Sequence, residues 1–167
     1  MVRRAYLIMD VQFVLFKFLE KLTTVSAPWT SWTTVLGWPE KVNFDAATKP
    51  LIYISTPMVV NDRVINHAGG LSRFELSTII GSWCTLESGG MYEASRISSA
   101  MIELFSNPQT IYSKQFTVTL GATTYTNTRL TTMGVRVKSI TGPVEIPDPD
   151  SLDFRQEITL NCNVGGS

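Results

Sequence analysis

Polar and apolar residues alternate most regularly near the end of the sequence, from Phe154 to Val164. Alternate positions are mostly apolar in one set and polar in the other; the first is Phe154, Gln156, Ile158, Leu160, Cys162 and Val164, and the second is Arg155, Glu157, Thr159, Asn161 and Asn163. This two-residue period predicts a strand with one buried face and one wet face. Parallel strands that are covered on both faces usually form continuous apolar runs, so the alternation favours an antiparallel sheet covered on one side.

Similar patterns predict further strands upstream. Residues 51–60 form an apolar run in which Pro57 places the second half at a sheet edge or a bulge. Residues 62–84 resemble a hairpin with Gly69 and Gly70 near its turn. Alternation also predicts strands over 115–120 and 133–140, and the threonine-rich residues between them suggest an exposed hairpin tip.

Helical spacing is seen in two other stretches, residues 1–22 and 91–105. We expect the second helix to begin near Gly90 and to stop by Asn107 and Pro108. Residues 23–50 are rich in Pro, Thr, Ser and Trp, which predicts a long surface connection with aromatic anchors. The expected fold is therefore a single α+β domain over residues 1–167, a mostly antiparallel sheet with two helices packed on one face.

The first predicted helix is apolar around most of its circumference. Its charged residues Arg3, Asp10, Lys17 and Lys21 share one narrow stripe. One sheet covers only one side of a helix, so either a neighbouring subunit or a buried position in the chain's own core must cover the rest. Asp10 interrupts the apolar stretch, and no small-residue cleavage site follows, so we expect a helix of a mature cytoplasmic protein and not a signal peptide.

Three aspartates, Asp148, Asp150 and Asp153, crowd into the segment before the last strand. A calcium loop would carry a glycine at its sixth position and a glutamate at its twelfth, but these positions hold Asp153 and Thr159. Pro147 and Pro149 fix the backbone, and Asp side chains bond to nearby backbone groups, so a rigid turn explains the composition without an ion. The turn is the favoured interpretation, and a metal site is the alternative.

Composition narrows the functional classes. Apolar residues make up 44% of the 167 residues, as in a globular domain, and the formal net charge is zero. A dedicated nucleic-acid binder normally carries a basic excess, so the balance disfavours that class. Two cysteines, Cys84 and Cys162, are too few for a disulfide framework or a zinc motif, and buried free thiols are expected.

Candidate catalytic residues are scarce. His67 is the single histidine, and a pair with Cys84 is conceivable, but no nucleophile motif surrounds that cysteine. The glycines in "ESGGMYEAS" lack the Lys-Ser/Thr ending of a phosphate-binding loop and fit a strand-to-helix turn. We therefore expect no enzyme activity, no cofactor and no metal.

The order of these parts resembles a known family. An apolar first helix, then "WPEKVNFDAATKPLIYIS", then the helix in "GGMYEASRISSAMIELF" and a last alternating strand is similar to the tail-terminator proteins of long-tailed bacteriophages. The stretch from 38 to 54 carries the resemblance best, followed by the helix at 91–105. Residues from about 121 to 153 exceed what a minimal member needs, which suggests an extended arm or hairpin there.

The resemblance implies a structural virion protein that is assembled in the host cytoplasm. Such proteins form a hexameric ring on the finished tail tube, stop its growth and join the tail to the head connector; their partners are copies of themselves, the tail-tube protein and a connector or stopper protein, with DNA only as the passing genome. The alternative in the same setting is another neck or tube component, such as a stopper, a tail completion protein or a tube subunit. The alternative outside this setting is a small cytoplasmic enzyme. Within this picture, the polar positions of the last strand, Arg155, Glu157, Thr159, Asn161 and Asn163, are the candidate lumen or subunit interface.

Overall fold

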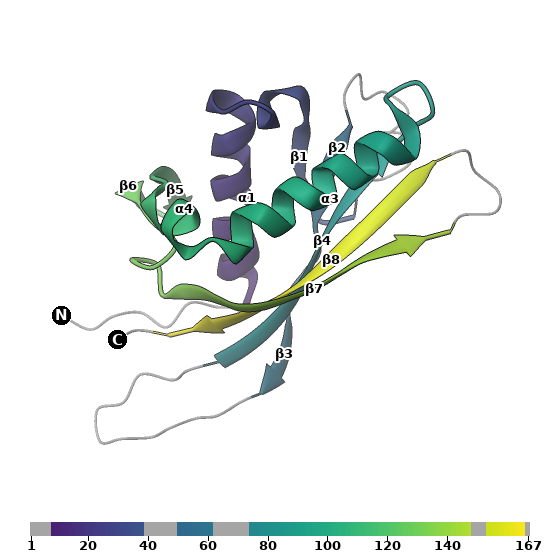
Figure 1. Ribbon diagram of the computed structural model, residues 1–167. Helices are drawn as coiled ribbons and strands as arrows, with labels where there is room; N and C mark the ends of the chain where they lie inside the picture. The colour runs from purple at the N-terminus through teal and green to yellow at the C-terminus, as the bar shows by residue number, and fades with distance from the viewer. Residues whose placement is uncertain (1–7, 39–49, 62–73, 148–152, 166–167) are drawn as a thin grey trace.

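The fold combines one large sheet, a separate hairpin and helices, as the sequence predicts (Figure 1). It was obtained as a computed structural model, which describes residues 8–38, 50–61, 74–147 and 153–165. The elements in chain order are α1 (Ile8–Val25), the short 3-10 helix η1 (Trp29–Ser31), β1 (Thr33–Leu36), β2 (Leu51–Ile54), β3 (Met58–Asn61), β4 (Phe74–Cys84), α3 (Gly90–Ser106), α4 (Pro108–Ser113), β5 (Phe116–Leu120), β6 (Thr123–Thr128), β7 (Val135–Ile146) and β8 (Phe154–Val164). The α+β class is confirmed.

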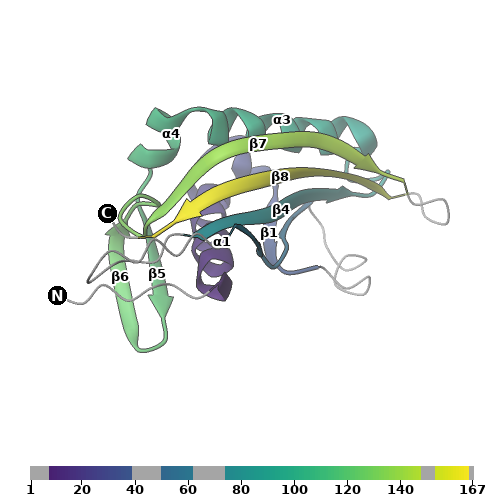
Figure 2. The same ribbon diagram turned by 90° about the horizontal axis from the view of Figure 1, so that it is seen from below.

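The main sheet has the strand order β1-β2-β4-β8-β7, and β3 also pairs with β4. Strands β4, β8 and β7 are long and curved and run side by side, with β7 at the edge of the sheet (Figure 2). Neighbours are antiparallel except β1 and β2, so the sheet is mostly antiparallel but mixed. The returning strand of the hairpin expected over residues 62–84 is β4, which pairs antiparallel with β3, while the first strand of that hairpin and its glycines lie outside the described residues.

The alternation of β8 sorts its residues onto two faces of the sheet. Ile158, Leu160 and Cys162 are fully buried, in one core with residues of α1 and α3. The odd-numbered positions Arg155 to Asn163 point to the opposite side. We call that side the outer face; its described residues on β4 and β8 are Glu75, Ser77, Ile79, Gly81, Trp83, Arg155, Glu157, Thr159, Asn161 and Asn163. Both helices therefore lie on one face, as predicted.

Helix α3 has the predicted limits. Gly89 adopts φ +106° just before the first turn, a conformation that glycine reaches without strain, so the glycines form a strand-to-helix turn. Asn107 leaves the helical conformation and its side chain accepts a hydrogen bond from the Thr110 amide at 3.3 Å. Pro108 then occupies the start of α4, so the residues that end one helix begin a second one, which the sequence analysis missed.

Helix α1 is covered largely by its own chain. Its residues pack against β1, β2 and η1, and on another side Phe18 meets Phe116 of β5 edge to face at 5.6 Å between ring centroids. Phe18 also lies 6.3 Å from Phe105 of α3. The sequence left two explanations for the apolar residues around most of this helix, a neighbouring subunit and the chain's own core. The chain's own core accounts for these contacts.

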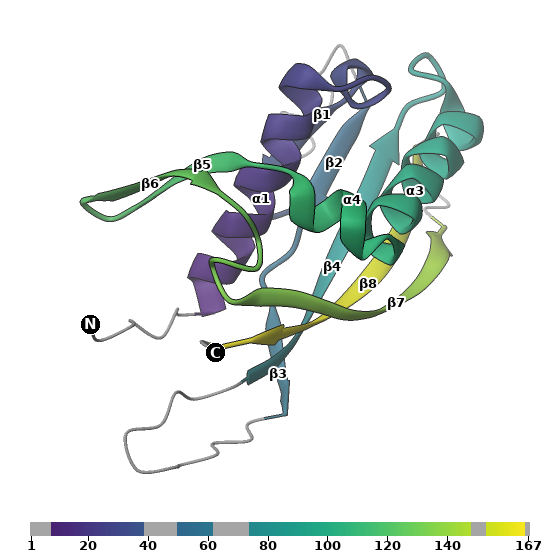
Figure 3. The ribbon, with the colours of Figure 1, turned by 60° about the vertical axis from the view of Figure 1, so that its left-hand side comes forward.

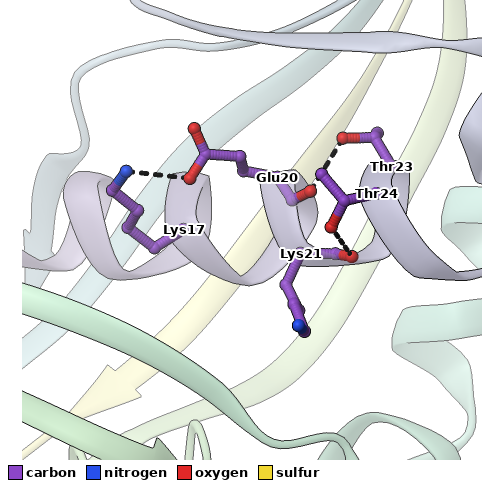
Figure 4. Close-up of polar contacts among 5 residues, drawn as sticks. All are labelled: Lys17, Glu20, Lys21, Thr23 and Thr24. Atoms are coloured by element: carbon purple, nitrogen blue, oxygen red, sulfur yellow. Dashed lines mark hydrogen bonds and ion pairs between the residues drawn. The ribbon is translucent and has the colours of Figure 1, made fainter.

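Polar residues follow the remaining side of α1, close to its C-terminal end (Figure 4). Lys17 Nζ pairs with Glu20 Oε2 at 2.8 Å, and the same ammonium lies over the rings of Phe13 and Phe16. Thr23 donates its hydroxyl hydrogen to the Glu20 carbonyl at 2.8 Å. The lysine thus shields the partly buried aromatic rings of this helix from water.

The prediction of a surface connection over residues 23–50 is wrong in part. This stretch contains η1 and the strand β1, which pairs in parallel with β2 from Thr33↔Leu51 to Leu36↔Ile54. Trp29 and Trp32 are buried and pack edge to face at 5.3 Å, so they belong to the core. A four-residue strand is too short for its alternation to stand out, which explains the miss.

The region from 121 to 153 divides into two parts. Strands β5 and β6 form a separate two-stranded hairpin that crosses α1 and extends beyond it (Figure 3). The threonine-rich tip expected from the sequence is this hairpin. Residues from Val135 to Ile146, however, join the main sheet as β7, so the expected arm does not include them.

Candidate functional site on the outer face of the sheet

The candidate interface residues lie together on the outer face. Strand β8 is flanked there by β4 and β7, and the aligned triplets across the three strands are Trp83–Arg155–Ile146, Gly81–Glu157–Val144, Ile79–Thr159–Thr141, Ser77–Asn161–Ser139 and Glu75–Asn163–Arg136. The five residues predicted from sequence therefore form one continuous row with neighbours on both sides. Their proximity follows from the register alone, because alternate residues of one strand share a face.

At one end of the row, Glu157 is held by a side chain from a distant strand. Tyr53 on β2 is fully buried, and its hydroxyl donates a hydrogen bond to Glu157 Oε1 at 2.5 Å. The ring crosses β4 at Gly81, where an added Cβ would lie 2.1 Å from Tyr53 Cζ. Trp38 stacks on the same tyrosine ring at 4.9 Å between centroids. Gly81 is thus the gap that lets the tyrosine reach β8.

Arg155 is the neighbour of Glu157 along this row and is also tied to the sheet. Its guanidinium lies 5.2 Å from the centre of the Trp83 ring, a cation–π arrangement. Trp83 belongs to a small second core with Leu51 and Tyr53. The predicted arginine is therefore packed against an aromatic surface of its own chain.

The middle of the row carries hydroxyl and amide groups. Asn161 donates from Nδ2 to Ser139 Oγ at 3.0 Å, and Thr159 faces Thr141 across the strands. At the other end, Lys138 on β7 reaches over β8 to pair with Glu75 on β4 at 2.8 Å. The outer face thus presents a central uncharged strip between charged residues; Arg155, Glu157, Lys138 and Glu75 contact their own chain, and Arg136, opposite Asn163, is exposed.

The electrostatics of this face keep Tyr53 neutral. Burial of the hydroxyl raises the pKa of Tyr53 well above its ordinary value, and the hydrogen bond to Glu157 and the charge of that carboxylate raise it further, while Arg155 acts in the opposite direction. The hydroxyl therefore stays a hydrogen-bond donor near neutral pH. The hydrogen bond thus fixes the position of the Glu157 carboxylate on the outer face.

Other candidates for chemistry give little support to catalysis. Cys84 is fully buried, and burial followed by the charge of Glu93 raises the pKa of its thiol to about 12. Cys162 is likewise buried, with a pKa raised to about 12. Both are free thiols, as expected. His67, the proposed partner of Cys84, lies outside the described residues.

The aspartate segment can be placed only in outline. Asp148 and Asp150 lie outside the described residues, and Asp153 directly precedes β8. The segment connects β7 to β8, which are antiparallel neighbours with Ile146 opposite Arg155. The turn interpretation therefore stays a prediction for residues outside the described part of the chain. Within the described part of the chain, no group of three or more His, Cys, Asp or Glu residues could hold a metal ion.

A shallow groove on the exposed side of α3 is a second surface feature. It has a volume of about 460 Å³ and is lined by Pro28, Tyr92, Ser95, Arg96, Ser99, Ala100 and Glu103. Arg96 lies 5.5 Å from the Trp32 ring centre and pairs with Glu93 at 3.1 Å, so its charge is already engaged.

None of the helices in the described part of the chain has the length and apolar character that crossing a membrane requires.

Sequence reasoning missed the residues that support the row, above all Tyr53 and Gly81. A glycine within the apolar run "STIIGSWC" was a usable signal, because glycine inside a strand often marks a close approach of another group. Its partner could not be found in this way, since Tyr53 and Glu157 are 104 residues apart.

No protein-family model matches the chain, and a search of curated proteins finds no match.

Proposed function

We propose that this chain is a structural subunit of a long-tailed bacteriophage, a tail terminator that forms a ring on the tail tube. In this proposal the ring stops tube polymerisation and joins the tail to the head connector. The proposal rests on the sequence resemblance and on the character of the outer face. It assigns the protein to the tail or neck of the virion, with assembly in the host cytoplasm.

The observation that carries the proposal is the uncharged strip on the outer face. Thr159 and Asn161 lie between an arginine stacked on Trp83 and a lysine paired with Glu75. Nucleic acid is held mainly by free cations that displace its counterions, so such a strip would not retain a passing duplex. Hydroxyl and amide groups also suit a polar subunit boundary, where each can find a partner.

The state of the thiols supports a structural role over the small-enzyme alternative. A nucleophilic cysteine needs a lowered pKa and access to substrate. Cys84 has the opposite properties, full burial and a pKa of about 12. The neutral formal charge of the chain also leaves little long-range repulsion between copies that assemble.

The direct experiment combines native mass spectrometry with electron microscopy of tails. The purified protein is expected to form a hexamer, and phage lacking it should make tubes that continue past their normal length. Tubes of normal length would contradict the terminator and favour a stopper or tail completion protein that joins tail and head. Absence of tubes would indicate a tube subunit. Unchanged tails together with a stable monomer would refute a role in this structure.

A further inference from the structure

The β5–β6 hairpin is the one part of the described chain that forms its own sheet. Its strands pair with each other from Phe116↔Thr128 to Leu120↔Thr123, and neither pairs with the main sheet. A two-residue turn, Gly121 and Ala122, joins them. No charged residue occurs from Gln115 to Thr128. An isolated two-stranded hairpin is marginally stable in water, so a third strand would stabilise it.

The two strands are supported unequally by the body of the protein. Phe116 and Val118 of β5 are buried against the core that includes α1. On β6, Thr123, Thr124 and Thr126 are exposed. The strand that most lacks contacts within the described chain is therefore β6.

The free edges of the described strands also differ in protection. Strand β7, at the edge of the main sheet, carries Lys138 and Pro143 at two places where its register with β8 shifts. Charged residues, prolines and bulges are the usual means of preventing edge-to-edge association. Strand β6 has one shift in its pairing with β5, but it contains neither a charge nor a proline. Within the part of the chain that the structure describes, its outer edge pairs with no other strand.

The backbone of β6 can be oriented from its register. Leu120 and Thr123 flank the two-residue turn and so form a hydrogen-bonded pair, which makes Thr119 and Thr124 the next, non-hydrogen-bonded pair. The N–H and C=O groups of Thr124 therefore point away from β5. Its side chain faces Thr119 across the hairpin, with 3.0 Å between the two hydroxyl oxygens.

We propose that the outer edge of β6 pairs, antiparallel, with β6 of a second copy of this chain. Two hairpins would then form one four-stranded sheet across a twofold axis, and the open groups of Thr124 would find their partners there. The sequence Thr-Thr-Tyr-Thr-Asn-Thr suits its own copy, because threonine opposite threonine is a favourable cross-strand pair and no like charges meet. The proposal concerns this edge alone and does not depend on the phage assignment.

A charge placed on the open edge tests the contact. In Thr124→Lys, two lysines approach each other across the twofold axis, and the matched control Thr117→Lys puts the same charge on an exposed position of β5. Sedimentation velocity over a concentration series should show at least about tenfold weaker dimerisation for Thr124→Lys, and no change for Thr117→Lys. Equal dimerisation in both variants, or a wild-type protein that is monomeric throughout, would overturn the proposal.

Cross-linking provides a positive signal that does not rely on disruption. Thr124→Cys should be joined to a second copy by a short bismaleimide, whereas Ser99→Cys on the exposed side of α3 should not. The native thiols are buried and do not compete. Cross-linking no stronger at position 124 than at position 99 would show that the β6 edges do not meet and would overturn the proposal.

Discussion

The hydroxyl of Tyr53 donates a hydrogen bond to Glu157 Oε1 at 2.5 Å, across the intervening strand β4. The contact joins β2, in the mostly buried part of the sheet, to β8, which carries the polar row. It exists because Gly81 has no side chain where the tyrosine ring passes. One aromatic ring thus couples the packing of the sheet to the position of a carboxylate on its outer face.

Adding a methyl group at Gly81 should break this coupling. In Gly81→Ala the new Cβ would lie 2.1 Å from Tyr53 Cζ, so the ring has to move. We expect the free energy of unfolding in urea to fall by about 1–3 kcal/mol, the usual cost of overpacking. The double variant with Tyr53→Ala should lose less than the sum of the two single changes. Additive losses would show that the ring does not occupy this place.

Removing the hydroxyl tests the hydrogen bond and its dependence on pH. Tyr53→Phe should lower the free energy of unfolding at pH 7 by about 1–3 kcal/mol, the range for a bond to a charged acceptor. The folded-state pKa of Tyr53 is raised above its ordinary 10.0, so its stabilisation is complete below pH 10 and is lost as the pH rises further. Wild-type stability should therefore decline above pH 10 more steeply than that of Tyr53→Phe. Tyr92→Phe, which changes an exposed tyrosine, is the control and should follow the wild-type curve. A wild-type curve no steeper than that of Tyr53→Phe would contradict the assignment.

The two buried thiols should also make the fold less stable as the pH rises, and this loss should begin at a lower pH than for Tyr53. Both folded-state pKa values rise from an ordinary 9.0 to about 12, so each buried thiol stabilises the fold fully below pH 9 and progressively less between pH 9 and 12. The loss is about 1.4 kcal/mol per pH unit for each thiol in that window. At pH 8, a thiol reagent should modify neither cysteine in the native protein and both in urea. Rapid modification without denaturant would reopen the enzyme alternative for Cys84.

Glu93 gives a test of the core around the first two tryptophans. Its Oε1 accepts a hydrogen bond from Trp32 Nε1 at 2.5 Å, and Trp32 is 2% exposed. In Glu93→Ala the indole N–H would be buried without this acceptor, which should cost about 1–3 kcal/mol in urea denaturation followed by tryptophan fluorescence. Arg96→Ala removes the exposed partner of the same carboxylate and should cost about 1 kcal/mol or less. Equal effects would argue against the buried bond.

These contacts show which features the sequence could predict. The limits of α3 followed from Gly90, Asn107 and Pro108, because helix ends have local chemical signals. The two faces of β8 followed from a regular, though not perfect, alternation over eleven residues. In both cases the information lies within one short stretch of chain, so no knowledge of the rest of the fold was needed.

The elements that the sequence failed to predict depend instead on contacts between distant parts of the chain. Strand β1 is four residues long and is defined by its parallel pairing with β2, which is not visible in either stretch alone. Likewise, the strand predicted over 133–140 is the first half of β7, but its second half looked like part of an arm because it contains Thr141, Gly142 and Pro143, residues typical of a loop. Pairing with β8 on one side overrides that local preference at an edge, where a proline is tolerated.

Substitutions at different positions of the polar row can separate its proposed role in ring assembly or DNA passage from its contribution to folding. Arg155→Glu should impair ring assembly or DNA passage, but the arginine also stacks on Trp83, so this variant should lose some stability as well. Thr159 lies in the middle of the row, and no side-chain hydrogen bond involving it is seen within the described residues, so Thr159→Glu changes the face with little effect on the fold. Thr24→Glu on the exposed side of α1 is the matched control, read by native mass spectrometry, infectivity and urea denaturation. If the face is a lumen or a subunit boundary, Thr159→Glu reduces rings or infectivity at nearly unchanged stability while Thr24→Glu does neither. Normal rings and infectivity from both Thr159→Glu and Arg155→Glu would rule out that role for the outer face.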